Sequence, residues 1–257
     1  MHLLIDIGNS TVVGAIANDN GEIVSTWRFD TIKNQTTDYY IDNLKSGLCA
    51  CGIEPSDIEK TAISSVVPEL NNRFVDAVSK ITGGEPRFFS VIDAERLMDI
   101  DVDFPEQVGK DRLADAIAAA ECYGSPTIVI DMGTATTVGI VTAQRKFVGG
   151  MIIPGVKTSH RALCERASQL SEIDKWEAGS IVGRNTKECM QSGVIFGAAC
   201  MIDGVIDRIN DMFDSPFTIV ATGGMSSVIV PYCKHDIIVD KHLLLKGIYH
   251  AVIAENK

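Results

Sequence analysis

The sequence predicts layered α/β domains built as two similar halves. Its main signal is an internal repeat, because the run from Asp6 to Gly14 recurs in outline from Asp131 to Gly139, 125 positions further along. Each copy follows a short apolar run and leads into another, as two strands joined by a tight glycine turn do. Strand-like and helix-like patterns then alternate in both halves, which indicates layered α/β domains.

The first half is expected to open with a β-hairpin whose first strand is Leu3 to Ile5. The periodicity of the residues that follow predicts two more strands and two helices. In chain order they are a strand at Val24 to Phe29, a helix at Thr37 to Cys51, a strand at Ala62 to Val67 and a helix at Glu69 to Ile81.

The second half is expected to open with a matching hairpin, whose first strand is Ile128 to Ile130. No low-complexity linker separates the halves, so the repeat alone places a boundary near Ser125 and divides the chain into domains 1–124 and 125–257. The other predicted elements are helices at Asp111 to Cys122, Lys157 to Leu170, Thr186 to Met212 and His242 to Glu255, and strands near Phe217 to Ala221 and Ile237 to Asp240.

Three glycines, Gly193, Gly197 and Gly204, fall inside the helix predicted from Thr186. Their spacing would let a neighbouring helix approach closely, but a break in the helix explains them equally well. The sequence does not choose between these two interpretations.

The composition is that of a folded chain, with 46% hydrophobic and 22% charged residues. A net charge of -11 argues against nucleic-acid binding, which needs clustered cations facing the phosphates. The chain opens on an apolar strand, and no stretch is expected to reach the roughly 20 apolar residues of a membrane span. The seven cysteines lack metal-ligand spacing. Reduced thiols and a cytoplasmic protein, with no membrane or nucleic-acid partner, are therefore expected.

The two Asp-x-Gly turns are well suited to a nucleoside triphosphate. Such a turn exposes backbone N–H groups to phosphate oxygens while its carboxylate faces a metal ion, and the two turns are expected to face each other across a cleft. The alternative is that both are plain hairpin turns. The small donors beside the glycines are Asn9, Ser10 and Thr11 in the first copy, and Thr134, Thr136 and Thr137 in the second.

A third glycine turn, Ala221-Thr222-Gly223-Gly224, follows the apolar strand that ends near Ala221. A glycine pair at a strand end could meet the adenosine of a nucleotide. It is also a common turn without a ligand.

The run Gly109-Lys110-Asp111-Arg112 comes just before an apolar helix. A carboxylate there can act as general base toward a substrate hydroxyl, and Arg112 can pair with an anionic group. Asp111 as a plain helix N-cap, with Lys110 and Arg112 solvated, explains the run equally well.

Two further glycine runs, Gly149 to Gly155 and Gly183 to Thr186, are predicted to be turns that precede helices. Free N–H groups at such positions favour anions. Turn formation alone would explain either run.

Taken together, these motifs resemble the type III pantothenate kinase family nearly end to end. The resemblance rests on Asp6-x-Gly-Asn, Gly109-Lys-Asp-Arg112, Asp131-x-Gly-Thr-Ala-Thr-Thr, Gly150-x-Ile-x-Pro-Gly155, Gly183-Arg-Asn-Thr186 and Ala221-Thr-Gly-Gly224. It implies two similar ribonuclease H-like (actin-like ATPase) domains, with mixed sheets flanked by helices and the nucleotide cleft between them. It also implies transfer of the ATP γ-phosphoryl group to the primary hydroxyl of pantothenate, the first step toward coenzyme A.

The resemblance assigns a role to each motif. Asp111 would be the general base, Asp131 a ligand of a monovalent cation (K⁺ or NH₄⁺), and Asp6 would orient Mg²⁺ through water. A homodimer is implied, with helices of the second half at its interface. The phosphates would be held by Asp6, Ile7, Gly8, Asn9, Ser10, Thr11, Val12, Val13 and Thr134, and pantothenate by Gly109, Lys110, Asp111, Arg112 and Thr186.

One departure concerns the pantothenate site. Many family members place a tyrosine seven residues before the first glycine of the Gly-x-Asp-Arg run, where this chain has Val102. A substrate contact at Val102 is therefore missing or replaced. The alternatives to the kinase are a non-catalytic nucleotide-binding regulatory paralogue and a kinase of another small alcohol, and the intact Asp111 and Arg112 favour the pantothenate kinase.

Overall fold

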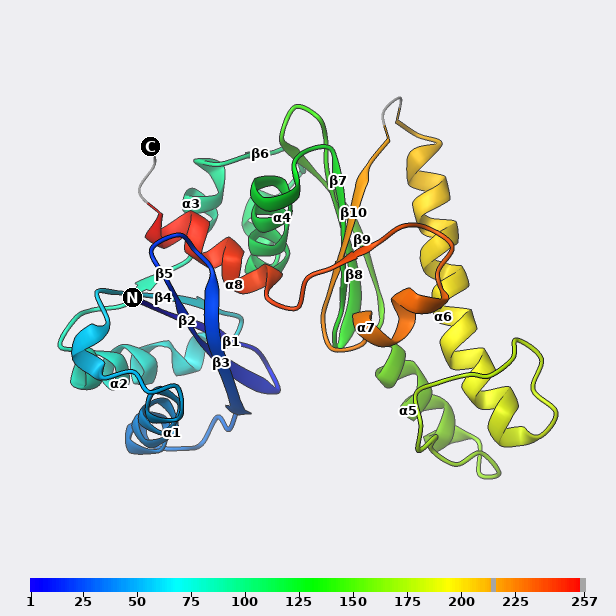
Figure 1. The fold of residues 1–257 in the computed structure, drawn as a ribbon, viewed down its shortest axis with the longest axis horizontal. Helices are drawn as coiled ribbons and strands as arrows, with labels where there is room; N and C mark the ends of the chain where they lie inside the picture. The colour runs from blue at the N-terminus through cyan, green and yellow to red at the C-terminus, as the bar shows by residue number, and fades with distance from the viewer. Residues whose placement is uncertain (214–215, 255–257) are drawn as a thin grey trace. The chain divides into compact units, whose positions relative to one another are not determined.

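The computed structural model describes residues 1–213 and 216–254, and the chain divides into two compact units. Unit 1 holds residues 1–121 together with the chain from His242, and unit 2 holds residues 122–241. Each unit has its own sheet and its own apolar core (Figure 1). The expected α/β fold, with mixed sheets flanked by helices, is confirmed.

The sheet of unit 1 is mixed and begins with the predicted hairpin. β1 (His2–Ile7) runs antiparallel to β2 (Thr11–Ala17) and parallel to β4 (Lys60–Ser65). With β3 (Ile23–Asp30) and β5 (Arg87–Phe88), the strand order is β3-β2-β1-β4-β5. Unit 1 also contains β6 (Asp99–Ile100), α3 (Val91–Glu95), α4 (Lys110–Tyr123) and α8 (Leu243–Ile248), the last followed by a π-helical turn at Tyr249–Ile253.

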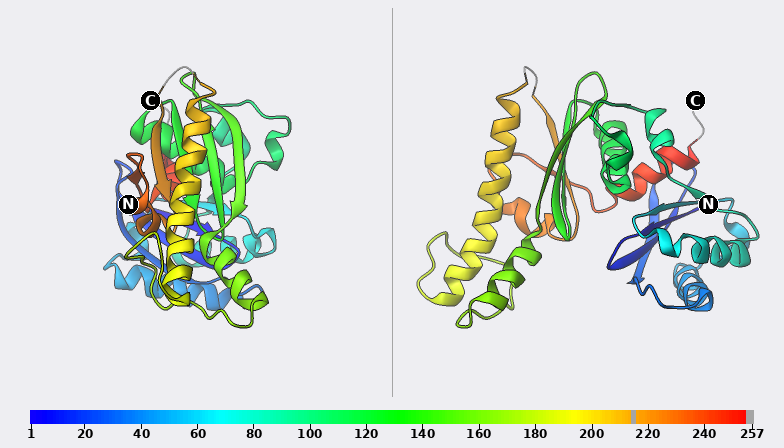
Figure 2. Two further views of the ribbon diagram at one scale, coloured as in Figure 1. Left: turned by 90° about the vertical axis from the view of Figure 1, so that its right-hand side faces the viewer. Right: turned by 180° about the vertical axis from the view of Figure 1, so that it is seen from behind.

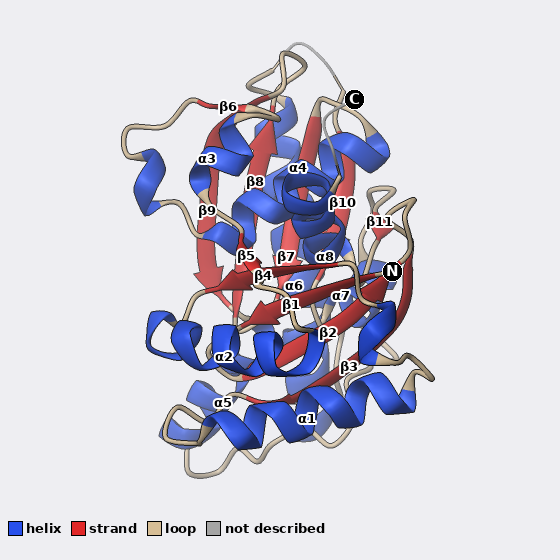
Figure 3. Ribbon diagram, turned by 90° about the vertical axis from the view of Figure 1, so that its left-hand side faces the viewer, coloured by secondary structure: helices blue, strands red, loops and turns tan. Residues whose placement is uncertain are grey.

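Helices α1 (Thr37–Ala50) and α2 (Asn71–Thr82) cover one face of this sheet (Figure 3). The Thr36 side chain caps α1 by accepting a backbone N–H of its first turn. Tyr40 of α1 and Phe74 of α2 are fully buried, and their ring centroids lie 4.7 Å apart. This aromatic pair is part of the apolar core of unit 1, whose burial stabilises the unit.

The C-terminal segment packs with unit 1 rather than with the second half in which the repeat placed it. Gly247 lies against the backbone of α4, so that a Cβ there would clash with the Ala114 carbonyl. The Tyr249 hydroxyl donates a 2.6 Å hydrogen bond to the carbonyl of Asp19. The compact units thus separate near the expected boundary at Ser125 and again before His242, a second division that a repeat cannot reveal.

Unit 2 repeats the hairpin plan around a second sheet. β7 (Thr127–Met132) runs antiparallel to β8 (Ala135–Val141) and parallel to β10 (Thr218–Thr222). β9 (Lys146–Pro154) pairs with β8, and β11 (Ile238–Val239) pairs with β10. The order within the unit is therefore β11-β10-β7-β8-β9.

The long helix α6 (Thr186–Asn210) runs along one face of this sheet (Figure 2). It buries Ile195, Ile202 and Ile206 in the core of unit 2. α6 is the described helix that is long and apolar enough, by length and composition, to cross a membrane, so the prediction that no stretch reaches that limit is wrong. Its core-facing isoleucines explain the high hydropathy, and the other helices of the unit are α5 (Val156–Arg166) and α7 (Ser226–Ile229).

Several local predictions are corrected. The run from Gly149 to Gly155, predicted as a turn, lies mostly in β9, where Gly150 has a φ of 153° and a Cβ would clash with the Val138 carbonyl. α5 ends at Arg166 and does not reach Leu170. α6 is continuous, so a helix break at its glycines is excluded. A Cβ built on Gly193, Gly197 or Gly204 has nothing within 4 Å in the described chain.

Candidate active site

The first Asp-Gly turn joins β1 to β2 and is held by a threonine that follows β3. The Gly8 N–H donates to the Thr11 carbonyl at 3.1 Å. The Thr31 hydroxyl donates to the Gly8 carbonyl at 2.7 Å, and the Thr31 N–H donates to the Ser10 carbonyl at 3.1 Å. These three bonds fix the turn, and Thr31 is a residue of this region that the sequence analysis missed, since a lone threonine carries no signal.

The predicted ligand residues of the first turn differ in exposure. Asn9 and Ser10 are exposed, and Asp6 and Val13 are half-buried. The side chains of Ile7 and Val12 belong to the core of unit 1. Residues 7 and 12 therefore offer a ligand only their main-chain groups. In the same unit, Val102 lies half-buried in the loop after β6.

The second Asp-Gly turn is one residue shorter than the first. Asp6 pairs with Val13 across the first hairpin, whereas Asp131 pairs with Thr137 across the second. The gap-free repeat had suggested equal turns. The shorter turn shifts β8 by one position, and Thr136 is consequently buried in the core and does not act as an exposed donor.

Thr134 is exposed at the tip of the second turn, and its carbonyl accepts two hydrogen bonds. One comes from the Gly155 N–H at 3.2 Å, and the other comes from the Thr158 hydroxyl at 2.8 Å. A Cβ on Gly155 would clash with the carbonyls of Gly133 and Thr134. The Gly150 to Gly155 run therefore has a structural role, because it brings the end of β9 against the second Asp-Gly turn and Gly155 hydrogen-bonds that turn.

The third glycine turn lies directly beside Asp131. The Met225 N–H donates to the Met132 carbonyl at 3.1 Å, and Gly223 has a φ of 84°. A Cβ on Gly223 would clash with Asp131 Oδ1. Two motifs that the sequence analysis weighed separately thus form one site in unit 2, with a carboxylate at a strand end against bare backbone.

Asp111 and its neighbours occupy the first turn of α4. Because the helix begins at Lys110, Asp111 lies within the helix and not at its N-cap. Its Oδ1 atom accepts the Arg112 N–H at 2.8 Å, and a Cβ on Gly109 would clash with that same oxygen. The Asp111 carboxylate thus lies close against Gly109, and a side chain at position 109 would displace it from this position.

The Arg112 guanidinium is half-buried. Burial lowers the pKa of Arg112, and the charge of neighbouring Asp111 opposes that shift. An arginine ordinarily loses its proton only far above neutral pH, so Arg112 remains a cation. The start of α4 thus presents a fixed positive charge beside a carboxylate.

The Gly183 to Thr186 run builds the start of α6. The Asn185 side chain caps the helix by accepting the Glu188 N–H at 3.0 Å, and the Glu188 carboxylate accepts the Arg184 N–H at 2.8 Å. Thr186 is exposed and lines a cavity of about 600 Å³ between α5 and α6. Capping explains Arg184 and Asn185, and Thr186 is the member of the run that faces this cavity.

Comparison with known proteins agrees with the motifs. A family described as type III pantothenate kinase matches residues 2–208. A type III pantothenate kinase of Finegoldia magna is 36% identical over 251 residues, covering 96% of this chain and 94% of the relative. One from Dictyoglomus turgidum is 38% identical over 253 residues, covering 97% and 98%.

Two solved structures support the fold alone, because their sequence identities are low. A protein of Campylobacter jejuni described as a Baf family transcriptional activator has a TM-score of 0.60 at 19% identity, covering 97% of this chain and 96% of its own. A ROK family glucokinase of Streptomyces griseus has a TM-score of 0.53 at 14% identity and covers 97% of each chain.

Proposed function

The chain belongs to the type III pantothenate kinase family and is an ATP-dependent kinase of pantothenate in coenzyme A biosynthesis, and we propose the roles that its residues take in that reaction. The pantothenate hydroxyl oxygen forms a bond to the γ-phosphorus of ATP while the bond from that phosphorus to the leaving oxygen breaks. The products are 4'-phosphopantothenate and ADP.

Asp111 is the general base of this reaction. The observation that carries the role is its position in the first turn of α4, where the carboxylate accepts the N–H of the half-buried Arg112 and lies against Gly109. The carboxylate accepts the hydroxyl proton as the new bond forms. Because phosphoryl transfer depends chiefly on alignment and charge neutralisation, Arg112 contributes by pairing with an anionic group of the substrates.

The N–H groups of the first turn and the exposed Thr134 bind the phosphates of ATP. Thr31 donates hydrogen bonds to the carbonyls of Gly8 and Ser10. Because these bonds fix the turn, its backbone N–H groups are held in position to meet phosphate oxygens. Ile7 and Val12 take part through their main chain. Gly109, Lys110, Arg112 and Thr186 bind pantothenate, and Val102 stands where many relatives have a tyrosine.

The carboxylates of both turns fit cations. Asp6 is the half-buried next-to-last residue of β1, and it would orient Mg²⁺ through water, since this ion usually keeps several of its waters. Asp131 lies at the end of β7 against the backbone of Gly223, and it would hold a monovalent cation, K⁺ or NH₄⁺. Bound Mg²⁺ supplies neutralisation of the charge that develops on the phosphates.

We also place a homodimer interface on the α5 and α6 face of unit 2, in a cytoplasmic protein. Gly193 and Gly197 line the apolar cavity of this face, and a Cβ on either has nothing near it in the described chain. Leu163 is 47% exposed and Ile152 is 70% exposed. A second copy would cover these side chains, and analytical ultracentrifugation of a Gly197→Arg variant tests the interface by its shift to monomer.

The decisive experiment measures 4'-phosphopantothenate formed from ATP and pantothenate with Mg²⁺ and K⁺ present. Asp111→Asn should lower kcat by about 100-fold or more while ATP binding persists. Glu106→Gln, which changes an exposed carboxylate just before α4, serves as the matched control and should leave kcat unchanged. Full turnover by Asp111→Asn would exclude Asp111 as the base, and a folded, ATP-binding natural chain without product would favour a regulatory paralogue.

A further inference from the structure

Unit 1 contains a polar pocket whose residues take no part in the proposed reaction. It has a volume of about 240 Å³. Its charged lining residues are Lys60, Arg87, Asp93 and Arg96, and the chain from Ala251 to Ala254 closes one side. The pocket therefore joins β4, β5, α3 and the C-terminal segment of the same unit.

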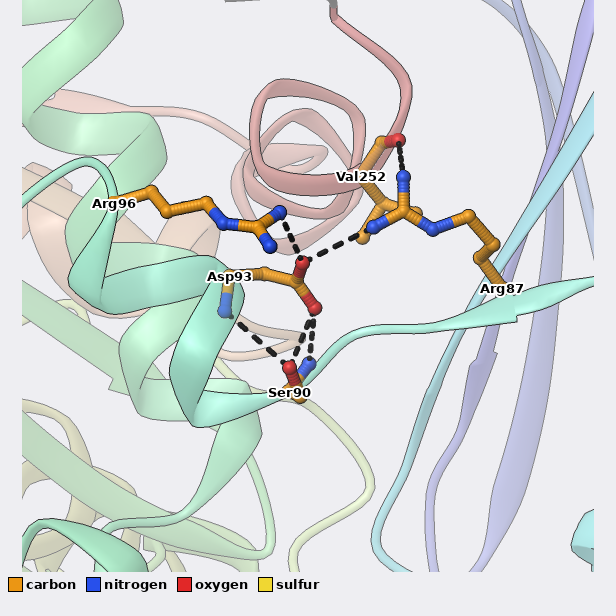
Figure 4. Close-up of polar contacts among 5 residues, drawn as sticks. All are labelled: Arg87, Ser90, Asp93, Arg96 and Val252. Carbon is orange, nitrogen blue, oxygen red and sulfur yellow. Dashed lines mark hydrogen bonds and ion pairs between the residues drawn. The ribbon is translucent and has the colours of Figure 1, made fainter.

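Two guanidinium groups meet at one buried carboxylate in this pocket (Figure 4). Asp93 Oδ1 accepts from Arg87 at 3.1 Å and from Arg96 at 3.3 Å, while Oδ2 accepts from the Ser90 N–H and hydroxyl at 3.1 and 2.6 Å. Arg87 also donates to the Val252 carbonyl at 3.1 Å. Figure 4 shows the two guanidinium groups approaching Asp93 from opposite sides.

These contacts use only part of the donor capacity of the two arginines. An arginine carries five N–H donors. In the described part of the chain, the bonds above occupy two of them on Arg87 and one on Arg96. The side chains are 59% and 54% exposed, whereas that of Asp93 is 7% exposed. The remaining donors are thus accessible and are held in place by a fixed carboxylate.

The charge of the pocket is not balanced by its own residues. Three cations line it and one carboxylate opposes them, in a chain whose net charge is -11. A single guanidinium would neutralise Asp93, so the second one adds positive charge beside this carboxylate. Arginine forks that approach from different sides match the several oxygens of a phosphoryl group.

We propose that the Arg87 and Arg96 pocket binds the phosphoryl group of a small anion, at a site separate from the candidate active site. Phosphate oxygens accept the unused N–H groups of both arginines, and Asp93 orients the forks before the anion arrives. Binding also reinforces the contact between β5 and the C-terminal segment at Val252. The volume leaves room for a few atoms attached to the phosphorus.

The test is calorimetric titration of the full chain at low salt, with inorganic phosphate and with glycerol 3-phosphate as probes. Arg96→Gln should weaken phosphate binding by about tenfold or more, since it removes a charged fork. Lys45→Gln, an equal charge change at an exposed position of α1, should leave it unaltered. The tighter of the two probes identifies free phosphate or a phosphate monoester as the ligand class.

Arg112→Gln separates this pocket from the candidate active site. Phosphate binding that survives Arg112→Gln but not Arg96→Gln supports the proposal. Binding lost in Arg112→Gln and kept in Arg96→Gln, or no binding by the natural chain, overturns it. If circular dichroism shows that Arg96→Gln has lost its fold, Arg96→Lys carries the same test, because it keeps the charge and should weaken binding by removing the planar fork.

Discussion

The two Asp-Gly turns have the same plan but different surroundings. In each turn, the carbonyl of the residue after the aspartate accepts a backbone N–H from the segment that follows the adjacent parallel strand. After β4, Val66 donates to Ile7 at 3.0 Å, and after β10, Met225 donates to Met132 at 3.1 Å. In each, a later threonine hydroxyl donates to a turn carbonyl, Thr31 in unit 1 and Thr158 in unit 2.

The difference lies beside the carboxylate. After β4 the chain continues through Val66 and Val67, which carry side chains, whereas after β10 it continues through Gly223 and Gly224. Asp131 therefore lies against the backbone of a glycine, Gly223, whereas Asp6 has no such glycine after its neighbouring strand. The second turn is also one residue shorter. One plan thus places the two carboxylates in different surroundings.

Among the variants that test this difference between the two turns, Gly223→Ala is expected to have the largest effect. The change places a Cβ against Asp131 Oδ1 and forces a side chain into a φ of 84°, which together should cost about 3 kcal/mol of unfolding free energy. Activity should fall with it. Gly224→Ala is the control, because a Cβ there meets nothing within 4 Å. Urea unfolding measures both, and equal stabilities would contradict the close packing at Gly223.

The next largest effect separates the two carboxylates by ion. Asp131→Asn should raise the K⁺ concentration needed for half-maximal activity, and Asp6→Asn should raise the corresponding Mg²⁺ concentration, each by about 10- to 100-fold. Titrations of both ions against both variants check this. If both variants respond to the same ion, the two turns do not divide the cations as proposed.

A smaller effect is expected from the two threonine hydroxyls. Thr31→Val and Thr158→Val each remove one hydrogen bond to a turn carbonyl and should cost about 1 kcal/mol of stability. If Thr31 holds the phosphate turn, its valine variant should raise KM for ATP more than it lowers kcat, and Thr31→Ser should restore KM. Thr26→Val, at an exposed position of β3, is the control.

The smallest effect concerns pH and distinguishes the two units. Burial lowers the pKa of His2 and of His250 in unit 1, so the unfolded chain takes up protons first as pH falls below about 6.5, and unit 1 loses stability there. In unit 2, burial raises the pKa of the Cys233 thiol to about 12 from 9.0. The unfolded thiol then ionises first as pH rises above 9.0, and unit 2 loses stability in that range.

The two tryptophans report the units separately, because Trp27 lies in unit 1 and Trp176 lies in unit 2. Variants that keep one tryptophan each can be unfolded in urea at pH 5.5, 7.5 and 9.5 while fluorescence is recorded. Trp27 should report the loss in acid and Trp176 the loss in alkali. The same pH response at both tryptophans would contradict the assignment of these groups to separate units.

Much of the fold could be predicted from periodicity and repeat. Both hairpins, α1, α4 and α6 were predicted close to their observed bounds, because each combines a clear apolar pattern with an end signal. The short elements β5, β6 and α3 were missed, since two to five residues carry no period. β9 was missed because its glycines indicate a turn, although they permit a close approach to β8.

The candidate site could be predicted only as separate motifs. Asp111, Asp131 and Gly223 all lie in runs that the sequence singles out, but that Gly223 touches Asp131 depends on parallel pairing between strands far apart in the chain. Thr31 and Thr158 could not be found, because a hydroxyl that bonds a distant carbonyl leaves no local pattern. The ligand roles of these residues stay predictions.

The packing of the C-terminal segment with unit 1 affects when each unit can be completed during translation. Unit 2 is a continuous stretch of chain whose residues have all been made once Lys241 has left the ribosome, whereas unit 1 still lacks α8 at that point. A nascent chain stalled before Leu243 would expose the surface of α4 that Gly247 covers. Truncation of the chain before His242 is therefore expected to damage unit 1, which holds the N-terminal residues, more than unit 2.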